Sequence, residues 1–487
     1  TLSVECSPGR SGVPDRTNEP KAKKECTMTG QTTNPLWDKI DAHIDQNVAY
    51  WIDQLARLCA QPSVSAQNDG IAECADLVAT MLREQGFRAE VMPSDGYPVV
   101  YGEGDGRSDK TLLFYLHYDV QPAEPLELWD SPPFQLTERE GKLYARGISD
   151  DKGHIICRLA ALAAVKEALG GELPCNVKFI IEGEEEVGSP NMPAFVDKHQ
   201  AKLAADACIW EFGGVDHDGR PSQALGMRGI CYVELSVQTA SIDAHSGLGG
   251  SIFPNAAWRL VWALNTLKDQ NERILIPGFY DNVQPPSARD LEMLAAMPSE
   301  AENLKEMFQL DGFLLGLTDD LELKKTAVFE PTCTICGLTS GYQGPGSKTV
   351  LPAQASAKVD FRLVPNQTPD EVVAKLRAHL DAHGFSDIQI KLNGGGRPAK
   401  VDPDDPFVQL TNETAELVYG KEPNVAPMIG GSGPNYPFIH TLGLPLVAAG
   451  VGYPGSQVHA PNENMRLDYF LLGTKHTARI IEQFAKR

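Results

Sequence analysis

Short, mostly apolar runs recur along the chain, and four of them lead to an acidic residue or a histidine. Residues 112–116, Leu-Leu-Phe-Tyr-Leu, are followed by His117 and Asp119. The run 176–181 leads into the acidic stretch 182–189, and the run 206–210 stops at Glu211. Residues 445–449 lead into a glycine-rich loop that reaches His459. Runs of this length next to turn residues predict buried β-strands.

Between residue 37 and about residue 225, these predicted strands alternate with segments of helical periodicity. Helices are predicted over 37–60, 71–85, 152–169 and 192–203. Such alternation is typical of an α/β fold with a sheet covered by helices on both faces. Ligands of open α/β sheets bind outside the carboxyl ends of the strands. We therefore expect the acids and imidazoles that follow the strands to converge at one sheet edge.

The pattern changes between about residue 227 and residue 399. Alternating polar and apolar positions predict half-buried strands over 230–238, 355–363 and 388–392, with helices over 254–267 and 369–383. This order suggests a small βαββαβ lid domain with a longer insertion over 273–325. The strand 445–449 and a helix over 467–486 then return to the first domain. The predicted divisions are a disordered extension (1–33), a catalytic domain in two parts (34–226 and 400–487) and a lid domain (227–399).

Composition excludes some classes of protein. The 487 residues carry a net charge of −22, which argues against binding to nucleic acid or to an anionic membrane. No stretch approaches the ~20 apolar residues of a membrane span. The ten cysteines are scattered, mostly within apolar runs, as in a reduced cytoplasmic protein. Residues 1–33 lack the apolar core of a secretory signal and have the composition of a disordered segment.

The residues at the predicted strand ends suit a metal site. His117 and Asp119 are two positions apart on an extended chain, so an imidazole and a carboxylate face the same way. Asp150 precedes the helix 152–169; an acid there can be only a helix cap, although Asp151 could fill that role. Two imidazoles and at least three carboxylates, without cysteine, suit Zn²⁺ best, with Mn²⁺ or Co²⁺ as alternatives. Five such side chains exceed the needs of one catalytic zinc and fit two ions about 3.5–4 Å apart.

These motifs resemble those of the M20 metallopeptidases, in particular the branch of carnosinases and cytosolic nonspecific (Cys-Gly) dipeptidases. The resemblance runs from about Trp37 to the C-terminus. It rests on His117-x-Asp119-Val-Gln-Pro, on Arg-Gly-Ile-Ser-Asp-Asp-Lys-Gly over 146–153, on Glu-Glu-Val-Gly-Ser over 185–189, on Arg-Gly-Ile-Cys-Tyr over 228–232, on His-Ser-Gly over 245–247, on Arg-Leu-Val-Pro-Asn over 362–366 and on His459-x-x-Asn-Glu. It implies a zinc-exopeptidase-like α/β catalytic domain, with a mixed sheet and an inserted ferredoxin-like βαββαβ lid and dimerisation domain.

The same resemblance implies a role for each candidate residue. His117, Asp150 and Glu211 would bind one metal ion, and Asp150, Glu186 and His459 the other. Asp119 would hydrogen-bond His117, Glu185 would be the general base, and His245 would act from the partner subunit of a homodimer formed through the lid. Ser432 and Thr349 would contact the substrate. One departure is that carnosinase-type enzymes usually carry Asp at the position of Glu211, although either carboxylate can ligate.

Arg362 is a candidate on physical grounds as well. It lies on an otherwise apolar predicted strand, where an unpaired charge is costly to bury. A bidentate contact with a peptide's C-terminal carboxylate would suit its guanidinium, and an internal salt bridge is the alternative.

The expected activity is hydrolysis of the amide of a dipeptide or similarly small peptide with a free carboxyl end. A water bridging the two metal ions would attack after Glu185 has removed its proton. An N-acyl- or N-carbamoyl-amino-acid amidohydrolase would use the same metal site and is the alternative. A non-catalytic relative would be expected to lack a ligand or the base, whereas here every such position is filled.

Overall fold

The central sheet is built around β3 (Gly106–His117), whose last six residues are all buried. The computed structural model describes residues 34–487, so the predicted extension 1–33 lies outside the described residues. Strand β3 pairs in parallel with β6 (Leu173–Glu182) on one side and with β7 (Ala207–Trp210) on the other. A strand with neighbours on both sides and cover on both faces needs apolar residues at every position. This explains why residues 112–116 are continuously apolar.

The complete sheet has six strands and is mixed, as predicted. Strand β19 (Leu446–Ala448) extends the parallel part beside β7, whereas β2 (Val99–Gly104) and β1 (Arg88–Met92) add an antiparallel edge beside β6. The strand order is β1-β2-β6-β3-β7-β19. The carboxyl ends of the four parallel strands therefore share one edge.

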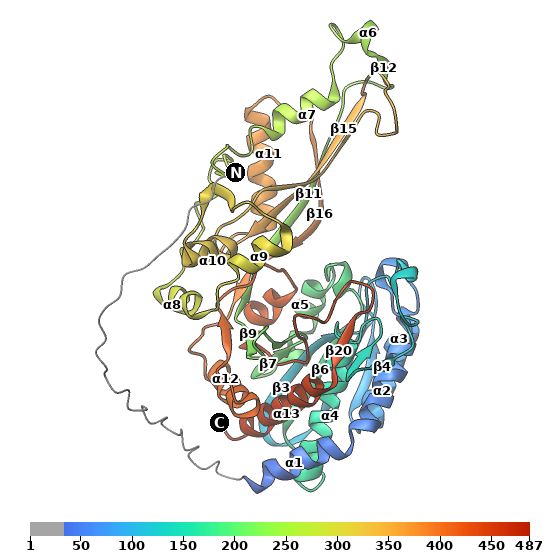
Figure 1. Ribbon diagram of the computed structural model, residues 1–487, viewed down its shortest axis with the longest axis vertical. Coiled ribbons are helices and arrows are strands. Elements are labelled where there is room, and N and C mark those ends of the chain that lie inside the picture. The colour runs from blue at the N-terminus through green and yellow to red at the C-terminus, as the bar shows by residue number, and fades with distance from the viewer. Residues whose placement is uncertain (1–33) are drawn as a thin grey trace, which may run out of the picture.

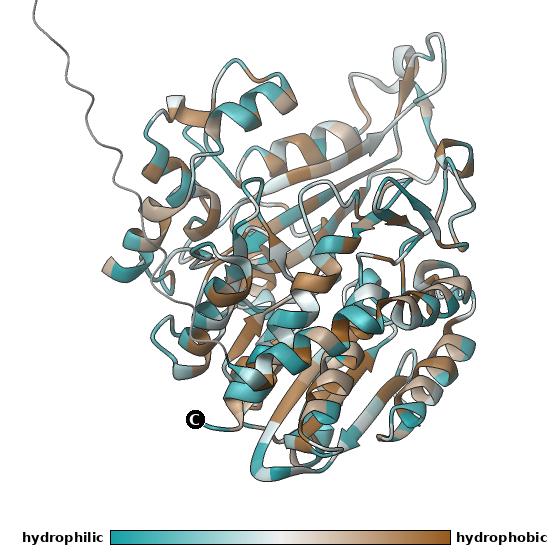
Figure 2. Cartoon of the chain, turned by 60° about the horizontal axis from the view of Figure 1, so that its bottom comes forward, coloured by the Kyte–Doolittle hydropathy of each residue, from teal (hydrophilic) through white to brown (hydrophobic). Residues whose placement is uncertain are grey.

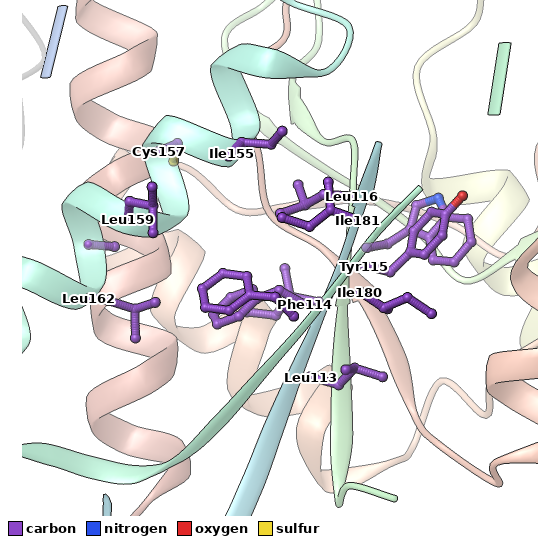
Figure 3. Close-up of a cluster of buried hydrophobic side chains, with 14 of the residues drawn as sticks. Leu113, Phe114, Tyr115, Leu116, Ile155, Cys157, Leu159, Leu162, Ile180 and Ile181 are labelled. Carbon is purple, nitrogen blue, oxygen red and sulfur yellow. The ribbon is translucent and has the colours of Figure 1, made fainter. Parts of the chain in front are cut away.

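Both faces of β3 pack against other elements. In Figure 3, Phe114 and Leu116 point toward Leu159 and Leu162 of α4 (Lys152–Ala168). Tyr115 points to the opposite face, where its ring stacks on that of Trp210 with 4.0 Å between ring centroids. Figure 2 shows the resulting pattern, with hydrophobic residues on the inner strands and on one side of the helices.

Most predicted helices agree with the structure, but the helix predicted over 37–60 is two helices. Helix α1 (Pro35–Gln46) ends at Asn47, whose side-chain amide donates to the main-chain oxygen of His43 at 2.8 Å, and α2 (Val48–Ala60) follows. Asparagine side chains compete in this way for main-chain groups and so interrupt helices. The other helices of this part are α3 (Ile71–Glu84), α5 (Met192–Leu203), α12 (Pro406–Tyr419) and α13 (Leu467–Phe484).

A second, antiparallel sheet has the order β13-β15-β11-β16 and its own hydrophobic core. Its strands are β11 (Gly229–Gln238), β13 (Thr334–Ser340), β15 (Gln354–Leu363) and β16 (Gln389–Gly396). With α7 (Ala256–Leu264) and α11 (Pro369–Ala382), they follow one another along the chain in the predicted βαββαβ order. We keep the domain limits at residues 226 and 400 as a proposal that these separate cores support.

The insertion after α7 is helical, with α8 (Ala288–Ala296), α9 (Ala301–Phe308) and α10 (Asp320–Phe329). At the far end of the second sheet, β12 (Ala244–His245) pairs with β14 (Val350–Leu351) beside α6 (Ser246–Gly249) (Figure 1). No helix in the described part of the chain is long and apolar enough to cross a membrane.

Small sheets brace the loops around the main sheet. They comprise β4 (Thr137–Arg139), β5 (Lys142–Tyr144) and β20 (Asn464–Arg466); β8 (Gly214–Val215), β9 (Pro221–Ala224) and β18 (Asn424–Ala426); and β10 (Gly226–Met227) with β17 (Ala399–Lys400).

Candidate metal centre

The parallel strands deliver acids and imidazoles to one sheet edge. His117 is the last residue of β3, and the turn after β6 carries Glu185 and Glu186 in a short 3₁₀ helix. Glu211 directly follows β7. The loop after β19 reaches His459, which has a left-handed backbone conformation with φ of 61°.

Asp150 lies between the two imidazoles. Its Oδ1 is 3.0 Å from Nε2 of His117, and its Oδ2 is 3.0 Å from Nε2 of His459. The same nitrogen of His459 is 3.1 Å from Oε2 of Glu186. Asp150, Glu186 and His459 each offer one ligand atom, and these atoms lie within 4.8 Å of one another. The carboxylate of Asp150 thus has one oxygen toward each half of the cluster.

Asp119 is fully buried beneath these residues, and its carboxylate lies close to His117 as well as to the Glu185–Glu186 turn. Nδ1 of His117 lies 3.0 Å from the main-chain oxygen of Asp119, and 3.5 Å from its Oδ1. The two carboxylate oxygens accept hydrogen bonds from the main-chain nitrogens of Glu185 and Glu186, at 3.2 and 3.0 Å. Asp119 therefore contacts His117 through both its main-chain oxygen and its carboxylate, and the same carboxylate holds the Glu185–Glu186 turn.

Opposite charges shift the pKa values of this cluster strongly. Burial acts against the charged form of Asp150, but His117 and His459 outweigh it and hold the pKa of this carboxyl far below its usual range. Burial also acts to lower the pKa of His117, yet Asp119 and Asp150 raise it well above its ordinary value. Asp150 and Glu186 raise the pKa of His459 to about 10. The acids around the two imidazoles therefore favour positive charge at this position.

The pKa values of the Glu185 and Glu211 carboxyls are raised, in contrast to that of Asp150. Burial, reinforced by Asp150 and Glu186, raises the pKa of Glu185 to about 7. Burial and the nearby Glu185 raise the pKa of Glu211 well above its usual value. Oε2 of Glu211 is buried and has no hydrogen-bond partner in the described part of the chain. Unpaired buried carboxylates are costly, so this arrangement favours a bound cation.

These residues fit divalent metal ions. The cluster contains imidazole nitrogens and carboxylate oxygens with no sulfur, the ligand set of Zn²⁺, Mn²⁺ and Co²⁺ sites. The eight cysteines of residues 34–487 are unpaired, and seven of them are buried. A divalent ion bound by these side chains would supply positive charge to a cluster that is rich in buried acids.

Two predicted substrate residues lie together elsewhere. Nη1 of Arg362, on β15, donates to Oγ of Ser432 at 2.9 Å, and its Nε donates to Asp360 at 3.0 Å. The internal salt bridge considered as an alternative is therefore present, but it engages only one edge of the guanidinium. A second guanidinium, Arg228, lies close by, and burial together with the charge of Arg362 lowers its pKa to about 10.

His245 and Thr349 lie at the tip of the second sheet, on and beside the paired strands β12 and β14. The main-chain nitrogen of Ser246 donates to the Thr349 oxygen at 3.1 Å, and His245 accepts from the nitrogen of Gly247 at 3.0 Å. Both side chains are exposed. Within the chain, β12 lies far from the parallel strands β3, β6 and β7 that lead to the metal cluster (Figure 1).

Three further residues of the centre belong to the sequence motifs but were not predicted as site residues. Gln121 donates through Nε2 to Oε2 of Glu186 at 2.9 Å. Asp151 stands at the N-cap of α4 without a capping bond; instead it accepts from the main-chain nitrogen of His117 at 3.1 Å. Glu463 accepts several bonds from the loop that bears Asp150. Their occurrence within motifs was the available signal, but only the fold reveals the partners.

Comparison with known proteins places the chain in a family. Residues 113–483 match peptidase family M20/M25/M40, so the chain belongs to that family. This agrees with the resemblance drawn from the motifs.

Individual relatives support the predicted branch. The Cys-Gly metallodipeptidase dug1 of Schizosaccharomyces pombe is 29% identical over 92% of this chain and 98% of its own length. The crystal structure of human carnosine dipeptidase 1 has 27% identity and a TM-score of 0.77, covering 93% of this chain and 99% of its own. The M20 family metallo-carboxypeptidase Sso-CP2 from Sulfolobus solfataricus has 36% identity and a TM-score of 0.86, covering 90% and 99%.

Proposed function

We propose that this M20-family protein is a dinuclear metal-dependent dipeptidase that cleaves the amide of dipeptides or similarly small peptides with a free C-terminal carboxylate. The position of Asp150, with one oxygen toward His117 and the other toward His459, is the observation that carries the proposal. The similarity to proteins named Cys-Gly and Beta-Ala-His dipeptidases supports the substrate class.

His117, Asp150 and Glu211 would hold one ion, and Asp150, Glu186 and His459 the other. Two such ions lower the pKa of water toward neutrality and polarise a carbonyl. We take Zn²⁺ as the first candidate, with Mn²⁺ and Co²⁺ as alternatives.

Glu185 would move the protons. Its pKa of about 7 suits a group that both accepts and donates a proton near neutral pH. The bonds that Asp119 accepts from the main-chain nitrogens of Glu185 and Glu186 fix the turn that carries Glu185. Glu185 would take the proton of the attacking water and give it to the leaving nitrogen.

Arg362, Ser432 and Thr349 would bind the substrate. Asp360 neutralises one of the two adjacent guanidiniums, Arg228 and Arg362, which leaves a positive charge to balance the carboxylate of a peptide. The carboxylate would displace the Arg362–Ser432 bond and gain the planar, bidentate contact that guanidinium favours. An anchor for the C-terminal carboxylate that is fixed relative to the metal ions would select short peptides.

His245, with Thr349 beside it, would come from the partner subunit of a homodimer formed through the lid domain and donate to the oxyanion. The exposed faces of Trp258, Val261 and Trp262 on α7, each at least 40% exposed, support contact with a second copy. The unpaired cysteines support a cytoplasmic location.

The test is a substrate panel on the apo-protein with Zn²⁺, Mn²⁺ or Co²⁺ added. Dipeptides should be cleaved, and the C-terminal amides of the same dipeptides should be poor substrates. Faster cleavage of N-acyl- or N-carbamoyl-amino acids would favour the amidohydrolase alternative. Release of C-terminal residues from longer peptides would favour a carboxypeptidase, which the similarity to Sso-CP2 makes the second candidate.

Arg362→Ala should lower kcat/KM for dipeptides by a factor that corresponds to about 2–5 kcal/mol of transition-state stabilisation. This is the range for removing one member of a buried charge pair. Arg362→Lys should restore part of the loss, because an ammonium keeps the charge but lacks the planar fork. The Ala variant should also lose most of the preference for the free acid over the amide. If wild type cleaves acid and amide equally well, Arg362 serves only its salt bridge to Asp360.

A further inference from the structure

Glu463 joins the two loops that carry Asp150 and His459. It stands four residues after His459 and immediately before β20, which pairs with β5. Because β5 leads directly into the segment 145–151, this pairing places the Glu463 side chain against the turn that carries Asp150. Its side chain is 1% exposed.

The Glu463 carboxylate accepts four hydrogen bonds, all from residues 146–150. Oε2 accepts from Nη1 of Arg146 at 2.7 Å and from the nitrogen of Gly147 at 2.9 Å. Oε1 accepts from the nitrogens of Ser149 and Asp150 at 2.9 and 3.1 Å. Each oxygen thus has two donors, and every bond fixes the turn that ends at Asp150.

A carboxylate suits this arrangement because both of its oxygens accept bonds. A glutamine would keep one accepting oxygen but would turn a donor toward the other two N–H groups, so that two bonds would become repulsive contacts. The buried guanidinium of Arg146 supplies the balancing charge, and its Nη2 also donates to the main-chain oxygen of Pro122 at 3.1 Å. The network therefore reaches the loop that follows His117.

The two imidazoles on either side of Asp150 differ in how well the rest of the fold holds them. The side chain of His117 is 1% exposed at a strand end, whereas that of His459 is 54% exposed on a loop. Asp150 lies between them. An anchor that ties the exposed ligand's loop to the turn of the shared carboxylate would reduce the freedom that metal binding has to remove.

We propose that Glu463 is a positioning residue that presets Asp150 and His459 for metal binding. This inference rests on the proposed dinuclear function. Glu463 touches neither the substrate nor the metal ions, and it acts through the main chain of residues 147–150.

The experiment compares Glu463→Gln with a matched control, Glu482→Gln. Glu482, on helix α13, is also 1% exposed. It accepts a hydrogen bond from Nε1 of Trp37 at 3.1 Å. Zn²⁺ affinity of the folded apo-proteins is measured by competition with a chromophoric chelator, and thermal unfolding is followed in parallel. We expect Glu463→Gln to lose at least ~10-fold in affinity, as for other partners that orient metal ligands. The control should unfold at a lower temperature but bind Zn²⁺ as wild type does.

Kinetics supply a second measurement. In Glu463→Gln, kcat should fall at limiting metal and recover at high metal, while KM changes little. Glu463→Asp keeps the charge but is one methylene short, so an intermediate loss of affinity is expected; this variant carries the test if the Gln variant does not fold.

The outcomes separate the two hypotheses. Wild type that binds fewer than two ions contradicts the proposed dinuclear function. If wild type binds two ions and a folded Glu463→Gln or Glu463→Asp variant binds Zn²⁺ within twofold of wild type, the proposed role of Glu463 is wrong. The proposed dinuclear function is then unaffected.

Discussion

At the scale of single residues, neighbouring acids in this chain have different environments. Glu185 and Glu186 are adjacent in one turn, and Asp119 accepts from the main-chain nitrogen of each. Glu186 lies 3.1 Å from His459 and accepts from Gln121, whereas Glu185 has a pKa raised to about 7 by burial. The fold thus gives one acid partners suited to ligation and leaves the other free to exchange a proton.

Glu185→Gln should therefore leave the fold and the metal content unchanged and reduce kcat by ~10²–10⁴, as for a lost general base. Glu186→Gln should instead lower the metal content, because an amide replaces a ligand carboxylate. The measurements are steady-state kinetics and elemental analysis of the purified variants. Near-normal turnover of Glu185→Gln would show that another group moves the protons.

The sequence predicts candidate residues of the centre more readily than their contacts. A strand end followed by an acid or an imidazole is visible in the chain, so His117, Glu211 and the 185–186 pair could be proposed without coordinates. The bonds that Asp119 accepts from Glu185 and Glu186, and the one that Asp151 accepts from His117, were not foreseen, because they join segments far apart along the chain. Glu463 and Asp150, for example, are separated by more than 300 residues and meet only through the pairing of β20 with β5.

At the scale of elements, periodicity located the strands and helices well, and the errors are local. The break at Asn47 depends on one side-chain amide, which hydropathy does not register. Helix packing also involves buried polar groups, and the hydropathy pattern does not predict that these groups are buried. Helix α13 packs on α12, and His476 on α13 lies with Nε2 3.1 Å from the main-chain oxygen of Thr411 on α12.

His476 should make stability depend on pH. Burial lowers its pKa from 6.5 to about 4, so the folded protein keeps it neutral while the unfolded chain accepts a proton below pH 6.5. The stability linked to His476 is therefore complete above pH 6.5 and decreases as the pH falls toward 4. At 1.36 kcal/mol per pH unit the loss is roughly 3 kcal/mol.

The measurement is urea unfolding of the apo-proteins at several pH values between 7.5 and 4, for wild type and His476→Gln. Glutamine can keep the donor to Thr411 but does not titrate, so the variant should lose less stability on acidification. Parallel pH profiles for the two proteins would show that His476 is not a source of the pH dependence.

At the scale of the whole molecule, the candidate residues fall into separate groups within one chain. The metal centre lies at the edge of the six-stranded sheet, whereas β12 and β14, with His245 and Thr349, lie at the far end of the second sheet (Figure 1). A loop tip that carries an exposed imidazole has no evident use in its own subunit. In the proposed homodimer, His245 at the tip of one subunit would act at the metal centre of the other.

Mixing two inactive variants tests this arrangement. His245→Ala lacks the tip imidazole and Glu185→Gln lacks the base, so each homodimer should be almost inactive. In a mixed dimer, the metal centre of the His245→Ala subunit keeps Glu185 and receives His245 from the Glu185→Gln subunit. An equal mixture should regain up to about a quarter of wild-type activity, because half of the dimers are mixed and each holds one intact site. Native mass spectrometry verifies that subunits have exchanged. If they have and activity stays at the level of the separate variants, His245 does not act across the subunit boundary, and the separation of the tip from the metal centre needs another explanation.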